Sequence, residues 1–170
     1  NPELEFRRRG DVEDDPSFKQ IIPYVVVECD WDDDTTGVLC YRRASSGGEG
    51  RLHGKMNIGI GGHINQSDVE GTTITAAFTY GAMRELEEEI GLKSSAYQIK
   101  GYIYDPSNEV GQVHLGVVCV VNLGDDDQLE FEDDIADPKW LSLQSLGMHY
   151  DEMETWSQHK LSKWHRWVKC

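Results

Sequence analysis

Three glutamates, Glu85, Glu88 and Glu89, are spaced so that they could act together. They lie in the stretch GAMRELEEEIGL, residues 81–92, whose apolar residues recur every three or four positions, as is typical of an amphipathic helix. At about 100° per residue, the three carboxylates fall on one arc beside the apolar stripe, whereas Glu87 points elsewhere. Like charges at this spacing repel each other, and a divalent cation with oxygen ligands would offset the repulsion. A solvated acidic helix face is the alternative interpretation.

The same stretch carries a specific motif. Residues 84–92, RELEEEIGL, match the second half of the Nudix box, R-E-U-x-E-E-x-G-U with U aliphatic, at every specified position. The chain therefore resembles a Nudix hydrolase, over roughly residues 21–148. The words IGIGGHI, VHLGV and ETWS, at residues 58–64, 113–117 and 154–157, are similar to a little-characterised branch of predicted Nudix phosphoesterases in bacteria and phages.

The first half of the box departs from the family pattern. Glu70 and Ala76 stand where the family places a glycine and a glutamate before the arginine. Upstream, Gly61-Gly62 resembles the turn that opens the motif, which implies an insertion within residues 65–73. The missing glutamate braces the arginine in the family, so we expect Arg84 to pair with Asp68 or Glu70 instead.

The resemblance implies the chemistry of the site. Nudix enzymes attack a diphosphate with water, and Mg²⁺ or Mn²⁺ neutralises the phosphate charge. By their positions in the motif, the expected metal ligands are the carboxylates of Glu85, Glu88 and Glu89 and the carbonyl of Gly61. Arg84 would orient a carboxylate through a bidentate pair.

The general base has several candidates. Glu85 or Glu88 of the box is one possibility, and a carboxylate from a distant loop is the other. Among the loop residues we favour Glu109, because it lies in a connector between two strands; the alternatives are Asp105, Glu130, Glu132 and Asp133.

Three further residues are candidates for binding substrate. Arg43 closes a predicted strand near the expected path of the phosphates, and surface solvation is its alternative role. His63 directly follows the glycine turn, and His114 lies in a strand heading for the same region. A histidine that is merely hydrogen-bonded within the structure is the alternative for both.

Composition limits the classes of partner. The chain has 170 residues and a net charge of −15, which argues against an extended nucleic-acid surface or an anionic membrane surface. Its four cysteines are far apart and form no CxxC pair. No apolar stretch is long enough to span a membrane, and no signal peptide is visible, so we expect a cytoplasmic protein. The resemblance adds the possibility of a homodimer.

The expected elements are those of a layered α/β domain, and the resemblance specifies a Nudix-type α/β/α sandwich with a mixed β-sheet. We expect a polar N-terminal arm over residues 1–20 and a single domain over residues 21–170 that includes a C-terminal helix. Thr72 or Thr73 would cap the glutamate helix. The strands are predicted over residues 21–28, 38–43, 56–60, 97–104, 112–122 and 138–141, with a polar turn at 30–37, a connector at 105–111, and further helices at 143–148 and 153–168.

These patterns favour a metal-dependent pyrophosphohydrolase that cleaves a nucleoside diphosphate derivative, of the nucleotide or dinucleotide class. One alternative is a non-catalytic Nudix-fold module that binds a nucleotide and regulates. Another is an enzyme that processes RNA ends or caps, which would require a clustered channel of Lys and Arg.

Overall fold

A six-stranded mixed sheet forms the centre of the protein. The computed structural model describes residues 5–32, 35–44, 54–69, 73–93 and 96–164. The strand order is β3-β2-β1-β5-β4, and β6 also pairs with β2. The β1–β5 pair is parallel, whereas the other pairs are antiparallel. The strands are β1 (Gln20–Asp32), β2 (Thr35–Arg43), β3 (Met56–Asn57), β4 (Gln98–Ile103), β5 (His114–Asn122) and β6 (Ile135–Ser142).

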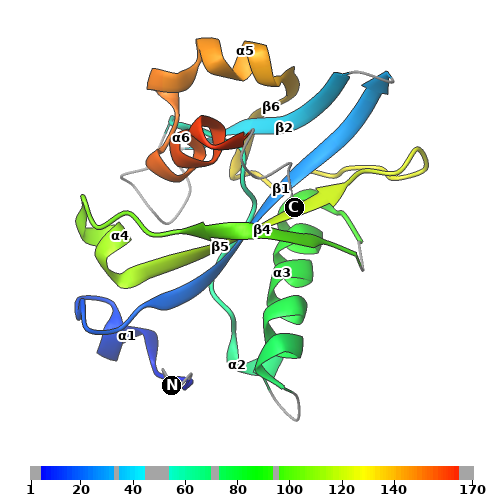
Figure 1. Cartoon of the computed structure of the whole chain (residues 1–170). Helices are drawn as coiled ribbons and strands as arrows, with labels where there is room; N and C mark the ends of the chain where they lie inside the picture. Colours follow the sequence, from blue (N-terminus) through cyan, green and yellow to red (C-terminus); the bar gives the residue numbers. More distant parts are fainter. Residues whose placement is uncertain (1–4, 33–34, 45–53, 70–72, 94–95, 165–170) are drawn as a thin grey trace.

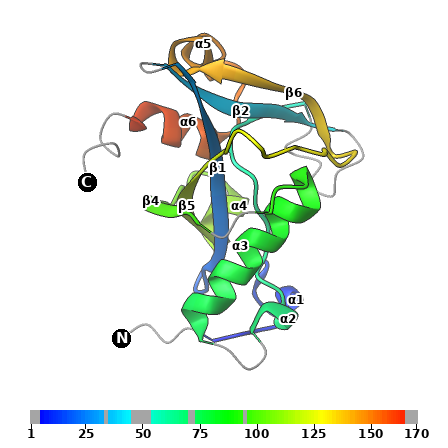
Figure 2. The ribbon, with the colours of Figure 1, turned by 90° about the vertical axis from the view of Figure 1, so that its right-hand side faces the viewer.

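Helices cover both faces of this sheet, which confirms the expected α/β layering (Figures 1 and 2). The long helix α3 packs on one face, and α5 and α6 pack on the other. Among the described residues, no helix has the length and apolar character needed to cross a membrane. The helices are α1 (Arg9–Val12), α2 (Gln66–Val69), α3 (Ile74–Ile90), α4 (Glu109–Val113), α5 (Leu143–Met148), the 3₁₀ helix η2 (Tyr150–Glu152) and α6 (Thr155–Ser162).

The alternation of side chains along β1 builds a core on each face. Val25 and Val27 join the core beneath α3, with Leu86 and Ile90 of that helix. Tyr24 and Val26 point the other way, into the core that contains Leu146 of α5 and Trp164. A strand buried on both faces is rich in β-branched residues throughout, as the run IIPYVVVE is.

Some boundaries differ from the sequence prediction. The expected polar turn at residues 30–37 is largely the extended end of the β1–β2 hairpin, where Asp30 pairs with Thr36. The connector after β4 ends in helix α4, because Asn108 accepts a hydrogen bond from the Gly111 amide and caps it, so β5 begins only at His114. The strand predicted at 56–60 ends at Asn57, and Ile60 forms an isolated bridge to Val25. Residues 165–168 of the predicted terminal helix lie outside the described residues.

Candidate active site

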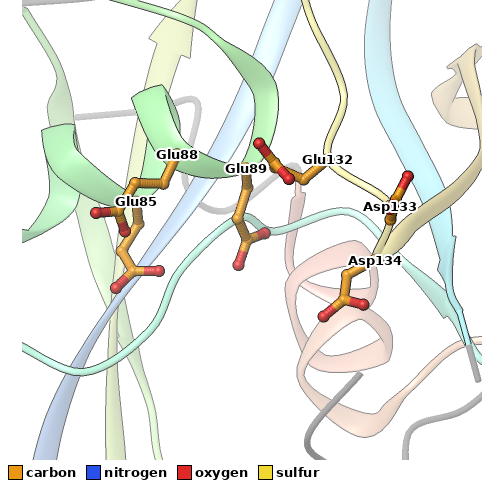
Figure 3. Close-up of a pocket in the computed structure, with 6 residues that line it drawn as sticks. All are labelled: Glu85, Glu88, Glu89, Glu132, Asp133 and Asp134. Carbon is orange, nitrogen blue, oxygen red and sulfur yellow. The ribbon is translucent and has the colours of Figure 1, made fainter. Parts of the chain in front are cut away.

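Helix α3 is held at both ends and along its apolar face. Thr73 caps its first turn by accepting a hydrogen bond from the Ala76 amide, as predicted, and Gly91 ends it in the left-handed conformation at φ 69°. Its apolar residues pack beneath the sheet. Because this face is buried, the adjacent face presents Glu85, Glu88 and Glu89 to a cavity that the loop preceding β6 also borders (Figure 3).

Arg84 ties two of these carboxylates to the inserted segment. Its Nη1 donates to Glu85 Oε1 and to Glu88 Oε2, each at 2.8 Å. Its Nε and Nη2 donate to the two oxygens of Asp68 at 3.2 and 3.1 Å. Nη2 also donates to the carbonyl of His63 at 2.9 Å. The expected partner of Arg84 is therefore Asp68 of α2, whereas Glu70 lies outside the described residues.

The glycine turn lies between the Glu85 side chain on helix α3 and the backbone of β1. A Cβ at Gly62 would lie 2.6 Å from Oε2 of Glu85. A Cβ at Gly61 would lie 1.8 Å from the carbonyl oxygen of Pro23 on β1. This approach supports Gly62 as the glycine of the box and places the insertion between the turn and α3.

A cavity of about 490 Å³ lies between α3 and the loop before β6. Acidic side chains line it from both sides (Figure 3). The amides of Glu130 and Glu132 donate to the carbonyls of Ile90 and Glu89, each at 3.0 Å, and these bonds hold the loop to the last turn of α3. The residues that line the cavity are Glu85, Glu88, Glu89, Glu132, Asp133 and Asp134.

Glu85 and Glu89 are largely buried, with side chains 13% and 18% exposed, whereas the Glu88 side chain is 59% exposed. Burial raises the pKa of Glu89 to about 7, an effect that the Arg43 guanidinium opposes and the Glu85 carboxylate reinforces. Arg43 Nη1 lies 3.9 Å from Glu89 Oε1. Oε2 of Glu89 and Nε of Arg43 are both buried without a hydrogen-bond partner among the described residues. A buried carboxylate oxygen with no partner is costly and indicates a missing ligand.

The donor set fits a hard divalent cation. Mg²⁺ is bound through carboxylate oxygens together with retained waters and phosphate oxygens, and the orphaned oxygen of Glu89 faces such a set. In the described part of the chain, no group of three or more acidic, histidine or cysteine side chains already forms a metal site. Arg84 keeps Glu85 and Glu88 from converging with Glu89, because its Nη1 is hydrogen-bonded to one carboxylate oxygen of each. Those two side chains would turn from Arg84 toward a cation.

His63 and His114 meet beside the glycine turn. Their Nε2 atoms are 3.3 Å apart, and Nδ1 of His114 lies 2.7 Å from the Val110 carbonyl. A carbonyl only accepts, so Nδ1 of His114 donates and, in the neutral ring, its Nε2 accepts a hydrogen bond from Nε2–H of His63. Burial lowers the pKa of His63 to about 4, and the charges of Arg9 and His114 add to the effect. The structure thus brings together two residues that the sequence singled out separately.

The distant candidates for the base divide into two groups. Glu109 and Glu130 are exposed, and Asp105 is buried with a carboxylate oxygen 3.4 Å from Nε2 of His159; none of these three lines the acidic cavity. Glu132 and Asp133 do line it. Asp134 also lines the cavity and was not among the sequence candidates, although it continues the same acidic run.

Comparison with known proteins decides the family. A family model described as the NUDIX domain matches residues 24–165. The chain belongs to the Nudix family. It is 39% identical over 158 residues to Protein YmaB of Bacillus subtilis, an alignment that covers 89% of this chain and 73% of YmaB. With the box glutamates of α3 in place, the chain is a Nudix hydrolase.

Solved structures agree with this assignment of the fold. Tm1382, described as a Nudix hydrolase, superposes with a TM-score of 0.69 at 29% identity, covering 96% of this chain and 78% of Tm1382. The NUDIX domain of Shewanella oneidensis NrtR, solved with ADP ribose, superposes with a TM-score of 0.66 at 13% identity, covering 92% of this chain and 94% of that domain. At 13% identity the second likeness concerns the fold alone.

Proposed function

We propose that this Nudix hydrolase cleaves the diphosphate linkage of a nucleoside diphosphate derivative in a reaction that depends on Mg²⁺ or Mn²⁺. The observation that carries the proposal is the cavity beside α3, whose lining side chains are all carboxylates. A diphosphate is itself an anion, so this cavity accepts it only when cations neutralise the carboxylates. The partnerless oxygen of Glu89 supplies a place for such a cation.

Each helix residue has a role in this scheme. Glu85, Glu88 and Glu89 would hold the cation, together with the Gly61 carbonyl at the adjacent turn. The cation stabilises charge on the phosphate oxygens and activates water. Arg84 is a positioning residue, since it touches Glu85, Glu88 and Asp68 rather than the solvent side of the cavity.

The reaction needs a base and a place for the leaving group. The oxygen of water attacks one phosphorus, the bond from that phosphorus to the bridging oxygen breaks, and the bridging oxygen leaves with the other phosphate. A carboxylate takes the proton of the attacking water. Position favours a residue that lines the cavity: Glu85 or Glu88 on the helix, or Glu132 or Asp133 across from it. Glu109 would act only if substrate extended beyond the cavity to α4.

Arg43, His63 and His114 are the proposed contacts to substrate. Arg43 lies at the end of β2 beside Glu89, at the border of the cavity. The histidine pair adjoins the glycine turn, where Nδ1 of the neutral His63 ring would accept a hydrogen bond from a sugar hydroxyl of the substrate. That the NUDIX domain of NrtR holds ADP ribose supports a nucleotide-type substrate. The net charge of −15 favours a small substrate over a long nucleic acid.

The test is release of phosphate or pyrophosphate from a panel of nucleotides, dinucleotides and nucleotide sugars, with and without Mg²⁺ or Mn²⁺. Glu88→Gln keeps the shape of the side chain and removes its charge. Glu87→Gln is the matched control, because Glu87 is exposed on the same turn and pairs with Lys93 at 3.1 Å. We expect metal-dependent release that falls by at least about a hundredfold in Glu88→Gln and stays unchanged in Glu87→Gln.

Two results would contradict the proposal. Equal turnover in Glu88→Gln and Glu87→Gln would show that the carboxylate arc does not hold the catalytic cation. No release from any compound, while a nucleotide still raises the melting temperature, would indicate a nucleotide-binding module without catalysis.

A further inference from the structure

Three short segments carry the narrower family resemblance, and they contact one another in the folded chain. They are IGIGGHI (residues 58–64), VHLGV (113–117) and ETWS (154–157). In IGIGGHI and VHLGV, His63 and His114 meet at their Nε2 atoms. In VHLGV and ETWS, the ring of Trp156 packs on Gly116, where an added Cβ would lie 2.7 Å from the ring. ETWS reaches back to IGIGGHI through Ser157, which accepts a hydrogen bond from the Ile58 amide at 3.1 Å.

We propose that a buried network of Tyr24, Glu154 and Ser157, on the face of the sheet opposite α3, positions the glycine turn that brings the backbone to Glu85. This inference rests on the proposed function, because the turn matters to catalysis through the carboxylates it adjoins. The three residues are positioning residues, since none of them lines the acidic cavity.

The network is fully hydrogen-bonded. Glu154 Oε1 accepts from the Ser157 hydroxyl at 2.6 Å and from the Tyr24 hydroxyl at 3.0 Å. The same carboxylate caps α6 by accepting from the amides of Trp156 at 2.7 Å and Ser157 at 2.6 Å. The Ser157 hydroxyl lies 2.8 Å from that of Tyr24, and the Ser157 side chain is 0% exposed. A buried polar group of this kind holds one geometry, because losing a partner leaves the others unsatisfied.

This network is hydrogen-bonded to residues 56–58, the segment that leads into the glycine turn. The Ile58 amide donates to Ser157 Oγ, and the Glu154 amide donates to the Met56 carbonyl at 3.0 Å. Gly59 lies directly on the ring of Tyr24, where a Cβ would come within 2.2 Å of a ring carbon. The Gly59 carbonyl accepts from the Tyr41 hydroxyl at 2.8 Å. Residues 58 and 59 therefore do not continue the pairing of β3 with β2, because their backbone groups bond to Ser157 of α6 and to Tyr41.

Consecutive backbone contacts connect this segment to the Glu85 side chain. Ile60 exchanges two hydrogen bonds of 2.8 Å with Val25, and Gly61 then lies against the Pro23 carbonyl. Gly62 follows and meets the Glu85 carboxylate. Because only three residues separate Ile58 from Gly62, a shift at the Ser157 bond moves the proposed carbonyl ligand of Gly61 and the space available to Glu85.

The decisive variant is Ser157→Ala, which removes the hydroxyl but leaves the backbone amide to bond with Glu154. We expect Mn²⁺ binding to the full chain without substrate, followed by the paramagnetic signal of free Mn²⁺, to weaken about tenfold. Amide hydrogen exchange should speed up at Ile58, Ile60 and Gly61. Tyr24→Phe keeps the ring beneath Gly59 and should give smaller changes of the same kind.

Ser142→Ala is the matched control. Ser142 caps α5 by accepting from the Ser145 amide at 3.2 Å, and α5 lies on the same face of the sheet without any bond to the turn. We expect Ser142→Ala to lower the melting temperature about as much as Ser157→Ala while leaving Mn²⁺ affinity and exchange at the turn unchanged.

The results separate this inference from the proposed function. If wild type binds no Mn²⁺ and releases no phosphate, the proposed function fails, yet exchange at the turn amides still decides whether the network holds the turn. If Ser157→Ala and Tyr24→Phe match Ser142→Ala in exchange at the turn, the network only packs α6 and the inference is overturned. If turn exchange speeds up but Mn²⁺ affinity is unchanged, the link from the turn to the carboxylates is overturned.

Discussion

Arg84 and Asp68 form a two-bonded ion pair that joins helix α3 to helix α2. Nε and Nη2 of the guanidinium donate to the two carboxylate oxygens at 3.2 and 3.1 Å. Asp68 is 7% exposed and also accepts from the Asn65 amide at 2.7 Å. Ala76 occupies the position where the family has its bracing glutamate. The insertion that interrupts the motif thus supplies the group that the motif lost.

Removing the charge of Asp68 should reduce both catalysis and stability. In Asp68→Asn the amide nitrogen faces a guanidinium that also only donates, so one bond is lost and Arg84 swings toward Glu85 and Glu88. We expect kcat to fall about tenfold or more and the free energy of unfolding to fall by about 1–3 kcal/mol. Steady-state kinetics and urea unfolding measure the two effects. The control is Asp137→Asn, which breaks the exposed pair with Lys139; an unchanged kcat in Asp68→Asn would contradict the bracing role.

Alanine at the two glycines of the turn should have different effects. In Gly62→Ala the new Cβ meets the mobile end of Glu85, which moves aside, so the protein folds but loses most of its turnover. In Gly61→Ala the Cβ meets the main-chain carbonyl of Pro23, and we expect a large loss of stability. Gly147→Ala has open space and is the neutral control. Melting temperatures and turnover of the three variants provide the comparison, and full activity in Gly62→Ala would contradict the close approach to Glu85.

The sequence predicts the helix, the layers and the carboxylate arc because these depend on local spacing. The periodicity of residues 81–92 and the caps Thr73 and Gly91 lie within one helix. The mixed sheet is expected from the match to the family motif rather than from local spacing. The sequence predicts a turn where Asp30 pairs with Thr36 in the hairpin. Polar residues do not distinguish the two, because they extend a two-stranded ribbon in solvent as readily as they form a turn.

Long-range pairings explain what the sequence left open. Asp68 was one of two candidates for Arg84, and only the fold of the insertion distinguishes them. Asp134 enters the cavity because the loop is bonded to the last turn of α3, 40 or more positions earlier in the chain. The bond from the Ile58 amide to Ser157 and the bond from Tyr24 to Glu154 join three segments, and no spacing rule connects them.

Arg43 should affect substrate binding, and its neighbour Arg42 provides the control. Arg43 is half-buried beside Glu89, whereas Arg42 pairs with Glu152 and donates to the Gly54 carbonyl. We expect Arg43→Gln to raise KM about tenfold through loss of a charged hydrogen bond to phosphate, with a smaller change in kcat. Arg42→Gln should leave both constants unchanged. A drop in kcat with KM unchanged would instead assign Arg43 to the support of Glu89.

His63 should make the fold sensitive to acid. Burial lowers its pKa in the folded protein from 6.5 to about 4, while the unfolded chain titrates near 6.5. Between these values the unfolded state binds more protons, so the free energy of unfolding decreases as pH falls from 6.5 through 4. In His63→Gln, whose amide still donates to His114, this part of the decrease should vanish. We expect the variant to lose on the order of 2 kcal/mol less than wild type over that range. Urea unfolding at pH 7 and pH 4.5 measures the difference, and parallel losses in the two proteins would show that His63 is not held neutral by the fold.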